Sequence, residues 1–142
     1  MKQLKDYING QWVDGTGTYI DVYNPSTGEV IAQVPVTTAD KVEEAIQAAA
    51  EAFKTWKDVP LQKRMGYLFK LRDALVNRKE ELAQLISTDQ AKHIADARAE
   101  VDRGIQLTET ACGLPLLLRG DKIAINAFMD GEITREPIGV VG

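Results

Sequence analysis

The side chains in this sequence that are best suited to chemistry are one thiol, one imidazole and two guanidinium groups on a charged segment: Cys112, His93, Arg98 and Arg103. A catalytic thiol needs a nearby base or a helix N-terminus to lower its pKa. Cys112 instead falls at the C-terminal end of a predicted helix, where the helix dipole disfavours a thiolate. We interpret Cys112 as a small, buried apolar side chain, and a nucleophile is the alternative.

The imidazole and the two arginines give weak signals when they are considered alone. His93 is the only histidine, and no cysteines or carboxylates cluster around it at metal-ligand spacing. We expect it at a helix start or on the surface, rather than as a ligand or general base. Arg98 and Arg103 lie beside Glu100 and Asp102, a pattern typical of a solvated charged helix face.

Glycine-rich phosphate loops are not apparent in the sequence. Four glycines, Gly10, Gly15, Gly17 and Gly28, are scattered among predicted turns, and none follows a strand and opens a helix. The residue chemistry therefore predicts a folded α/β segment without an assembled active site.

Length and composition narrow the class of protein. The chain has 142 residues and a formal net charge of −4, with 44% apolar and 27% charged residues, which argues against long disorder. This length allows one domain but not two. The mild acidity argues against nucleic acid as a partner. The sequence shows no apolar run of about 20 residues and no signal-peptide core, and a single cysteine excludes an internal disulfide, so we expect a cytoplasmic protein.

Short strands are predicted for the first part of the chain. Asn9-Gly10 between two apolar pairs is a strong hairpin signal. Further strands are predicted over residues 19–23 and 29–34, with a turn at 24–28 between them.

The middle of the chain is predicted to be helical. A helix is expected to start at residues 37–40 with a hydroxyl cap, and its apolar positions recur on one face. These positions are Val42, Ala45, Ile46, Ala49, Phe53 and Trp56. A break at 58–60 precedes a second helix, which restarts near Asn77, and a last helix covers about 94–112 and is closed by Gly113 and Pro115.

The end of the chain returns to β structure. Residues 122–128 alternate between apolar and polar types, Asp130-Gly131 is a turn signal, and residues 132–136 are predicted to run back. Residues 137–142 resemble the entry to a buried parallel strand. A chain that stops there, without a linker or cap, is expected to be a truncated piece of a domain.

Four segments in register carry a resemblance that spans essentially the whole chain. They are residues 7–13 (YINGQWV), 22–30 (VYNPSTGEV), 48–56 (AAAEAFKTW) and 135–142 (REPIGVVG). Together they resemble the N-terminal portion of the aldehyde dehydrogenase superfamily. The resemblance implies the α/β N-terminal segment of that fold, an incomplete Rossmann-type domain. It assigns residues 1–121 to the NAD-binding domain, 122–136 to a β-hairpin oligomerisation arm, and 137–142 to the first strand of the nucleotide-binding sheet.

A fifth segment points to one branch of that superfamily. Residues 100–105 (EVDRGI) resemble a signature of the CoA-acylating (methyl)malonate-semialdehyde dehydrogenases. The resemblance implies that Arg103 grips the carboxylate of the substrate, for which the planar guanidinium is well suited. The alternative is a surface ion pair of Arg103 with Glu100 or with a neighbouring chain.

The resemblance also implies cofactors and partners. Family members use NAD, and this branch uses coenzyme A as well, but the catalytic cysteine and the NAD-binding residues follow Gly142 in the family. Cys112 does not match the catalytic motif, so the isolated chain is expected to be inactive and to bind neither cofactor alone. Expected partners are the remainder of the dehydrogenase chain or sister subunits. A non-catalytic assembly module and a decayed, truncated gene product are the alternatives.

One position departs from the family pattern. The family usually has Glu-x-Gly-Lys before the last helix, and this sequence has Asp-Gln-Ala-Lys at residues 89–92. If the glycine serves a turn with positive φ, Ala91 is expected to strain that turn.

Overall fold

The N-terminal strands form two small sheets in the computed structural model, which describes residues 2–142. Strand β1 (Lys2–Gln3) pairs in parallel with β5 (Val30–Pro35), which pairs antiparallel with β4 (Tyr19–Tyr23). Strands β2 (Asp6–Ile8) and β3 (Gln11–Val13) form the predicted hairpin. Asn9 and Gly10 have φ values of 49° and 75°, as a two-residue turn with positive φ at both positions requires. Met1, the first residue of the N-terminal segment that lacks a signal-peptide core, lies outside the described residues.

Helix α1 (Ala39–Trp56) begins where the sequence predicts, but the predicted hydroxyl cap is wrong. Thr38 occupies the N-cap position without a side-chain cap. The neighbouring hydroxyl of Thr37 instead donates to the carboxylate of Asp6, at 2.9 and 3.1 Å from its two oxygens. This bond ties the start of α1 to β2, so a tertiary contact takes the place of local capping.

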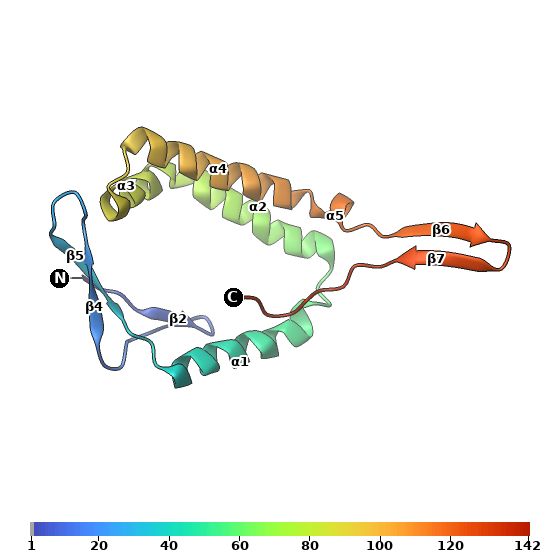
Figure 1. The fold of residues 1–142 in the computed structure, drawn as a ribbon, viewed down its shortest axis with the longest axis horizontal. Helices are drawn as coiled ribbons and strands as arrows, with labels where there is room; N and C mark the ends of the chain where they lie inside the picture. Colours follow the sequence, from blue (N-terminus) through green and yellow to red (C-terminus); the bar gives the residue numbers. More distant parts are fainter. Residues whose placement is uncertain (1) are drawn as a thin grey trace.

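The apolar face predicted for α1 is present but uncovered. None of the 18 residues of α1 is buried, and Val42, Ile46 and Trp56 are 46%, 45% and 44% exposed. The helix contacts the hairpin strand β2, and it lies apart from the main helical layer (Figure 1). The amphipathic pattern therefore marks a face that the described residues do not fill.

Three helices form the packed layer of the molecule. Helices α2 (Leu61–Asn77), α3 (Lys79–Gln90) and α4 (Ile94–Cys112) follow one another, and α4 packs against both of the others. The break at 58–60, the restart near Asn77 and the bounds of the last helix are confirmed. A short helix α5 (Leu114–Leu117), which contains Pro115, was not predicted. The core of this layer consists of Ala83, Ala97, Val101 and Ile105.

The junction between α3 and α4 confirms the expectation for Ala91. This residue is the C-cap of α3 and has φ 55° and ψ 24°, the left-handed region. A side chain with a Cβ adopts this conformation at a cost of roughly 1–2 kcal/mol, and glycine does so freely. The Ser87 hydroxyl donates to the carbonyl of Lys92 at 2.7 Å and helps hold the junction in this shape.

Replacing Ala91 with glycine is expected to stabilise the chain by about 0.5–1 kcal/mol. The relief of left-handed strain exceeds the added entropy of the unfolded glycine. Urea unfolding followed by helical circular dichroism measures the change in midpoint. Ala74→Gly, at an exposed position within α2, is the matched control and should lower the free energy of unfolding by about 1 kcal/mol. Equal destabilisation by both substitutions would show that the junction carries no strain.

The last two strands form a hairpin whose predicted turn is wrong. Strand β6 (Asp121–Asn126) pairs with β7 (Met129–Ile133), and Asn126 lies opposite Met129. The turn is therefore at residues 127–128, where the backbone N–H of Phe128 donates to Asn126 Oδ1 at 2.9 Å. Gly131 lies within β7 opposite Ile123, and a Cβ there would come within 3.2 Å of Ile123 Cγ2. Close packing, rather than a turn, accounts for Gly131.

The hairpin projects away from the helical layer, and the chain then returns toward the space between α1 and α2 (Figure 1). Residues 137–142 form no strand in the described part of the chain, because no neighbouring strand pairs with them. Their assignment to a nucleotide-binding sheet stays a prediction. None of the helices within residues 2–142 combines the length and the hydropathy that crossing a membrane would take.

Candidate functional site

Helix α4 positions Arg103 on its outer side. Ala97, Val101 and Ile105 follow one another every four residues and are buried against α2 and α3. Ala83 on α3 and Ala97 on α4 are both 0% exposed, so these helices approach each other closely. Arg103 lies two residues after Val101, which places it on the opposite side of the helix. The burial of the two alanines and Val101 thus determines the side of α4 from which Arg103 projects.

Two lysines that precede α4 in the chain pair with carboxylates close to Arg103 in the sequence. The Nζ atom of Lys79 lies 2.6 Å from a carboxylate oxygen of Asp102. Lys92 pairs with Glu100. The alternative reading of Arg103, an ion pair with Glu100, is therefore not observed, because Lys92 takes that carboxylate.

Arg98, the other arginine of the predicted charged face, is also engaged. Its guanidinium donates through two nitrogens to the two oxygens of Glu80, at 2.7 and 2.9 Å. These hydrogen bonds and the charge of Arg98 hold the pKa of Glu80 below its ordinary value. The contribution of this pair to stability is therefore present at neutral pH and is lost in acid, as the pH falls through the lowered pKa.

Arg103 differs from these residues because it has no hydrogen bond or ion pair within residues 2–142. Its side chain is exposed and lines a surface hollow of about 550 Å³. The other lining residues are Ala99, Asp102, Gln106, Leu107 and Thr110. Because Lys79 neutralises Asp102, the guanidinium of Arg103 is the unpaired charge of this hollow. A planar, unpaired guanidinium in a hollow can bind a carboxylate through two parallel hydrogen bonds.

Residues near this hollow were missed by the sequence analysis. Gln106, Leu107 and Thr110 follow Arg103 by three, four and seven positions, which places all of them on one helix face. That spacing is the signal that would have found them.

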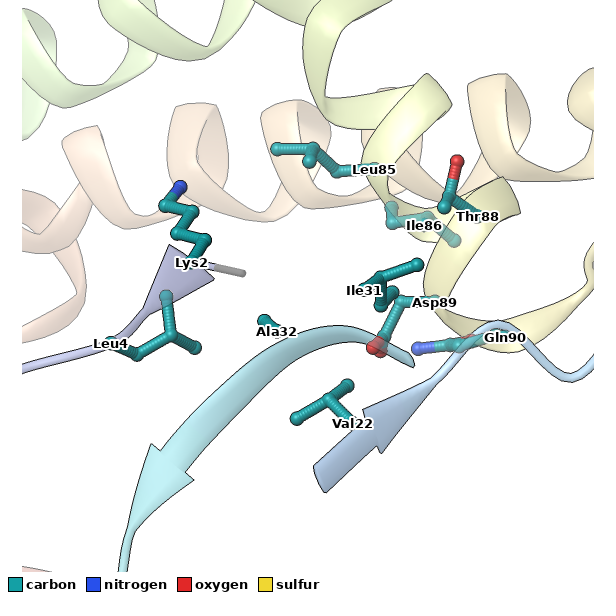
Figure 2. Close-up of a pocket in the computed structure, with 10 residues that line it drawn as sticks. All are labelled: Lys2, Leu4, Val22, Ile31, Ala32, Leu85, Ile86, Thr88, Asp89 and Gln90. Carbon is teal, nitrogen blue, oxygen red and sulfur yellow. The ribbon is translucent and has the colours of Figure 1, made fainter. Parts of the chain in front are cut away.

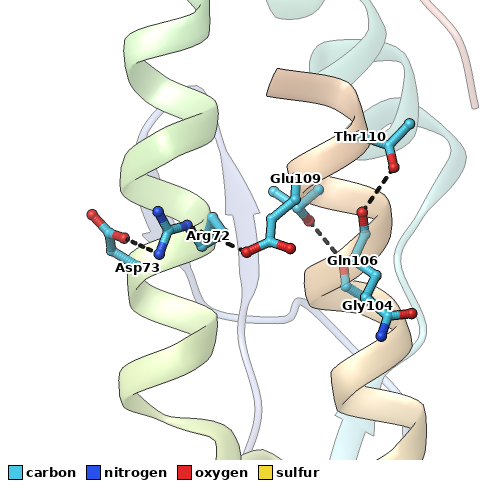
Figure 3. A network of polar contacts seen from close by, with 7 residues as sticks. Arg72, Asp73, Gly104, Gln106, Glu109 and Thr110 are labelled. Atoms are coloured by element: carbon cyan, nitrogen blue, oxygen red, sulfur yellow. Dashed lines mark hydrogen bonds and ion pairs between the residues drawn. The ribbon is translucent and has the colours of Figure 1, made fainter. Parts of the chain in front are cut away.

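Arg72 on α2 is a second arginine near α4, but it already has partners. Figure 3 shows it between Asp73, at 3.1 Å, and Glu109 of α4, at 3.9 Å. The hydroxyl of Thr110 donates to the backbone carbonyl of Gln106 in the same view. The hydroxyl of Thr108 donates to the carbonyl of Gly104, so both bonds stay within α4. The ion pair of Arg72 with Glu109 is the contact of this network that links α2 to α4.

Cys112 and His93 lie at opposite ends of α4. The cysteine is free and half-buried at the C-terminal end. His93 is the N-cap, and its Nδ1 accepts a hydrogen bond from the backbone N–H of Ala95 at 3.3 Å, which confirms the prediction of a helix-start histidine. A 19-residue helix separates them by about 28 Å, so they cannot act as a thiol–imidazole pair.

A second hollow, of about 410 Å³, lies between the N-terminal sheet and α3 (Figure 2). Val22, Ile31 and Leu85 contribute apolar surface to it, while Lys2 and Asp89 are charged members of the lining. Its largely apolar surface is typical of packing space rather than of a reactive centre. No group of three or more histidine, cysteine or carboxylate side chains within residues 2–142 is arranged to hold a metal ion.

The described residues do not form a cradle for a dinucleotide phosphate. The strand-to-helix connection from β5 to α1 spans residues 36–38 and contains no glycine. A dinucleotide-binding turn needs glycines at such a connection to let the backbone approach the pyrophosphate. Within residues 2–142, this connection therefore lacks the glycine turn that holds a dinucleotide phosphate.

Comparison with known proteins identifies the family to which this chain belongs. The family model described as "Aldehyde dehydrogenase family" matches residues 12–142. The chain therefore belongs to the aldehyde dehydrogenase family, and its α/β fold matches the N-terminal part of known structures of that family.

The similar proteins point to one group within the family. The chain is 48% identical to malonate-semialdehyde dehydrogenase 2 of Oceanobacillus iheyensis, over all of this chain and 30% of that protein. It is 46% identical to malonate-semialdehyde dehydrogenase of Bacillus subtilis, with the same coverage. A crystal structure of methylmalonate-semialdehyde dehydrogenase from Oceanimonas doudoroffii matches 97% of this chain and 28% of its own, with a TM-score of 0.90 and 34% identity.

A related structure carries a cofactor. The putative methylmalonate-semialdehyde dehydrogenase of Sinorhizobium meliloti, complexed with NAD, matches 98% of this chain and 29% of its own, with a TM-score of 0.89 and 29% identity. The chain thus spans about 30% of the length of the curated relatives it matches.

Proposed function

We propose that residues 1–142 are the N-terminal part of an NAD-dependent, CoA-acylating (methyl)malonate-semialdehyde dehydrogenase. The single observation that carries the proposal is Arg103, an exposed guanidinium without a partner in a hollow whose other charges are paired. The similarity to malonate-semialdehyde dehydrogenases supports the same substrate class, an aldehyde that also bears a carboxylate.

In this proposal Arg103 binds and orients the substrate carboxylate. Two parallel N–H···O bonds fix both the position and the rotation of a carboxylate, so the aldehyde end of a short semialdehyde is held at a defined distance from α4. In an enzyme of this kind NAD accepts the hydride and coenzyme A accepts the acyl group. The chain's own contribution is to bind and orient the substrate, and it is expected to be inactive alone.

The proposal also assigns roles along the chain. Residues 1–121 belong to the N-terminal part of the NAD-binding domain, and 137–142 lead into its sheet. The hairpin at 122–136 serves assembly with sister subunits. Its exposed apolar side chains support this role, since Ile123 is 67% and Phe128 100% exposed. Such an exposed hairpin without a covered edge is a usual site for pairing with another chain.

A chimera tests the proposed function. Residues 1–142 replace the matching part of the Oceanobacillus iheyensis relative, and NAD reduction is followed with 3-oxopropanoate as substrate. We expect CoA-dependent reduction by the chimera and none by the isolated chain. The relative without its matching part is the control for activity that does not need these residues. A folded chimera that fails to reduce NAD would overturn the proposal.

A further inference from the structure

Gly104 lies in the interior of α4, one residue after Arg103, at a position where a glycine is unfavourable. A glycine inside a helix destabilises it relative to alanine, because the unfolded glycine has more conformational freedom to lose. The φ of Gly104 is not in the positive range that favours glycine. A Cβ built on it would meet no atom of another segment within 4 Å in the described part of the chain. Neither the backbone conformation nor the packing of residues 2–142 therefore requires a glycine here.

The space beside Gly104 belongs to a hollow of about 420 Å³, which we call the Gly104 hollow. Apolar side chains from three helices form most of its lining: Leu75 on α2, Leu82 and Ile86 on α3, and Val101 and Leu107 on α4. Glu100 and Arg103 are its two charged members, and Glu100 is paired with Lys92. Arg103 is therefore the charged group of this apolar hollow that has no partner within residues 2–142.

Arg103 lies at the boundary between the Gly104 hollow and the more polar hollow of about 550 Å³ described above. Arg103 and Leu107 line both of them. These two residues are four positions apart, so they are neighbours on the surface of α4. A ligand whose carboxylate binds Arg103 can therefore place an apolar branch in the Gly104 hollow while its other end stays in the polar hollow. This combination fits a carboxylate with an apolar branch on the neighbouring carbon.

We propose that the Gly104 hollow receives the substituent on carbon 2 of the substrate, that the enzyme acts on 2-alkyl-3-oxopropanoates with branches larger than methyl, and that Gly104 is a specificity-determining residue. The inference rests on the proposed function, because it starts from a substrate carboxylate bound to Arg103. Carbon 2 is bonded directly to the carboxylate carbon, so its substituent lies next to the guanidinium. Burial of each methylene in an apolar hollow corresponds to about a fourfold gain in kcat/KM.

A substrate series and one alanine substitution test this inference in the chimera. Steady-state NAD reduction in the presence of coenzyme A gives kcat/KM for 3-oxopropanoate and for its 2-methyl and 2-ethyl derivatives. Gly104→Ala adds one methyl group to the hollow, and should lower kcat/KM for the 2-ethyl substrate about tenfold more than for 3-oxopropanoate. The 2-methyl substrate should fall between them. Comparison of these ratios with those of the unsubstituted chimera cancels the different intrinsic reactivities of the aldehydes.

Gly66→Ala is the matched control. Gly66 is a glycine within α2 whose Cβ position is equally open, and it lines neither hollow beside Arg103. Both substitutions favour the helix and should not lower the unfolding temperature of the chimera, but Gly66→Ala should leave the substrate ratios unchanged. Equal effects of Gly104→Ala on all three substrates, or no reduction of NAD with the 2-ethyl substrate by a chimera that uses 3-oxopropanoate, would overturn this inference alone. Failure with every substrate would overturn the proposed function as well.

Discussion

Arg103→Ala in the full-length chimera is expected to lower kcat/KM for 3-oxopropanoate about 100-fold, while kcat/KM for propanal changes less than about twofold. The reason is that a hydrogen bond to a charged group contributes roughly 1.5–3 kcal/mol. The paired bonds from an exposed guanidinium to a carboxylate are expected to contribute about 2.7 kcal/mol together, which corresponds to about 100-fold. Propanal has no carboxylate, so its binding loses no hydrogen bond when Arg103 is replaced. Steady-state NAD reduction with both aldehydes measures the ratio.

Two matched variants separate this role from a general effect of charge on α4. Arg98→Ala removes an arginine of the same helix whose guanidinium is hydrogen-bonded to Glu80. This variant should leave the ratio of kcat/KM for the two aldehydes unchanged. Arg103→Lys keeps the charge but loses the planar fork, so an intermediate ratio is expected. If Arg103→Ala lowers kcat/KM equally for both aldehydes, the proposal that Arg103 binds the substrate carboxylate is wrong.

Ala97→Leu is expected to destabilise the chain by about 1–3 kcal/mol, the usual cost of forcing methylenes into a packed core. Ala97 is 0% exposed and belongs to the cluster that also contains Ala83, Val101 and Ile105. A leucine there would push α4 away from α3, because two alanines set their close approach. Urea unfolding of the helical circular dichroism signal measures the loss.

Ala99→Leu is the control for the core substitution. Ala99 lies two residues further along α4, on the exposed side, and the same enlargement there should change stability by less than about 0.5 kcal/mol. Similar unfolding midpoints for Ala97→Leu and the unmodified chain would mean that the α3–α4 contact is loose.

Elements with local causes could be predicted from the sequence. Pro60 lies in the break between α1 and α2, Gly113 follows α4, and Asn9-Gly10 makes a tight turn, so these boundaries follow from single residues. The strain at Ala91 was likewise visible from one substitution in a family pattern. Each of these effects acts within a few residues, where side-chain and backbone chemistry dominate.

Features with distant causes could not be predicted. In the last hairpin, Gly131 pairs with Ile123 across the ladder and the turn lies at residues 127–128, a register that involves both strands rather than one dipeptide. The isolation of Arg103 depends on Lys79 and Lys92, which lie earlier in the chain and capture its acidic neighbours only when α3 packs on α4. The uncovered face of α1 has no local signal at all, since an amphipathic pattern looks the same whether or not a partner is present.

The chemical identity of the product gives the most direct test that these residues belong to a CoA-acylating semialdehyde dehydrogenase. The chimera is incubated with 3-oxopropanoate, NAD and coenzyme A, and the products are identified by mass spectrometry. The account predicts acetyl-CoA, with one CO₂ and one reduced NAD formed for each aldehyde consumed. A free carboxylic acid formed at a rate independent of coenzyme A would contradict it.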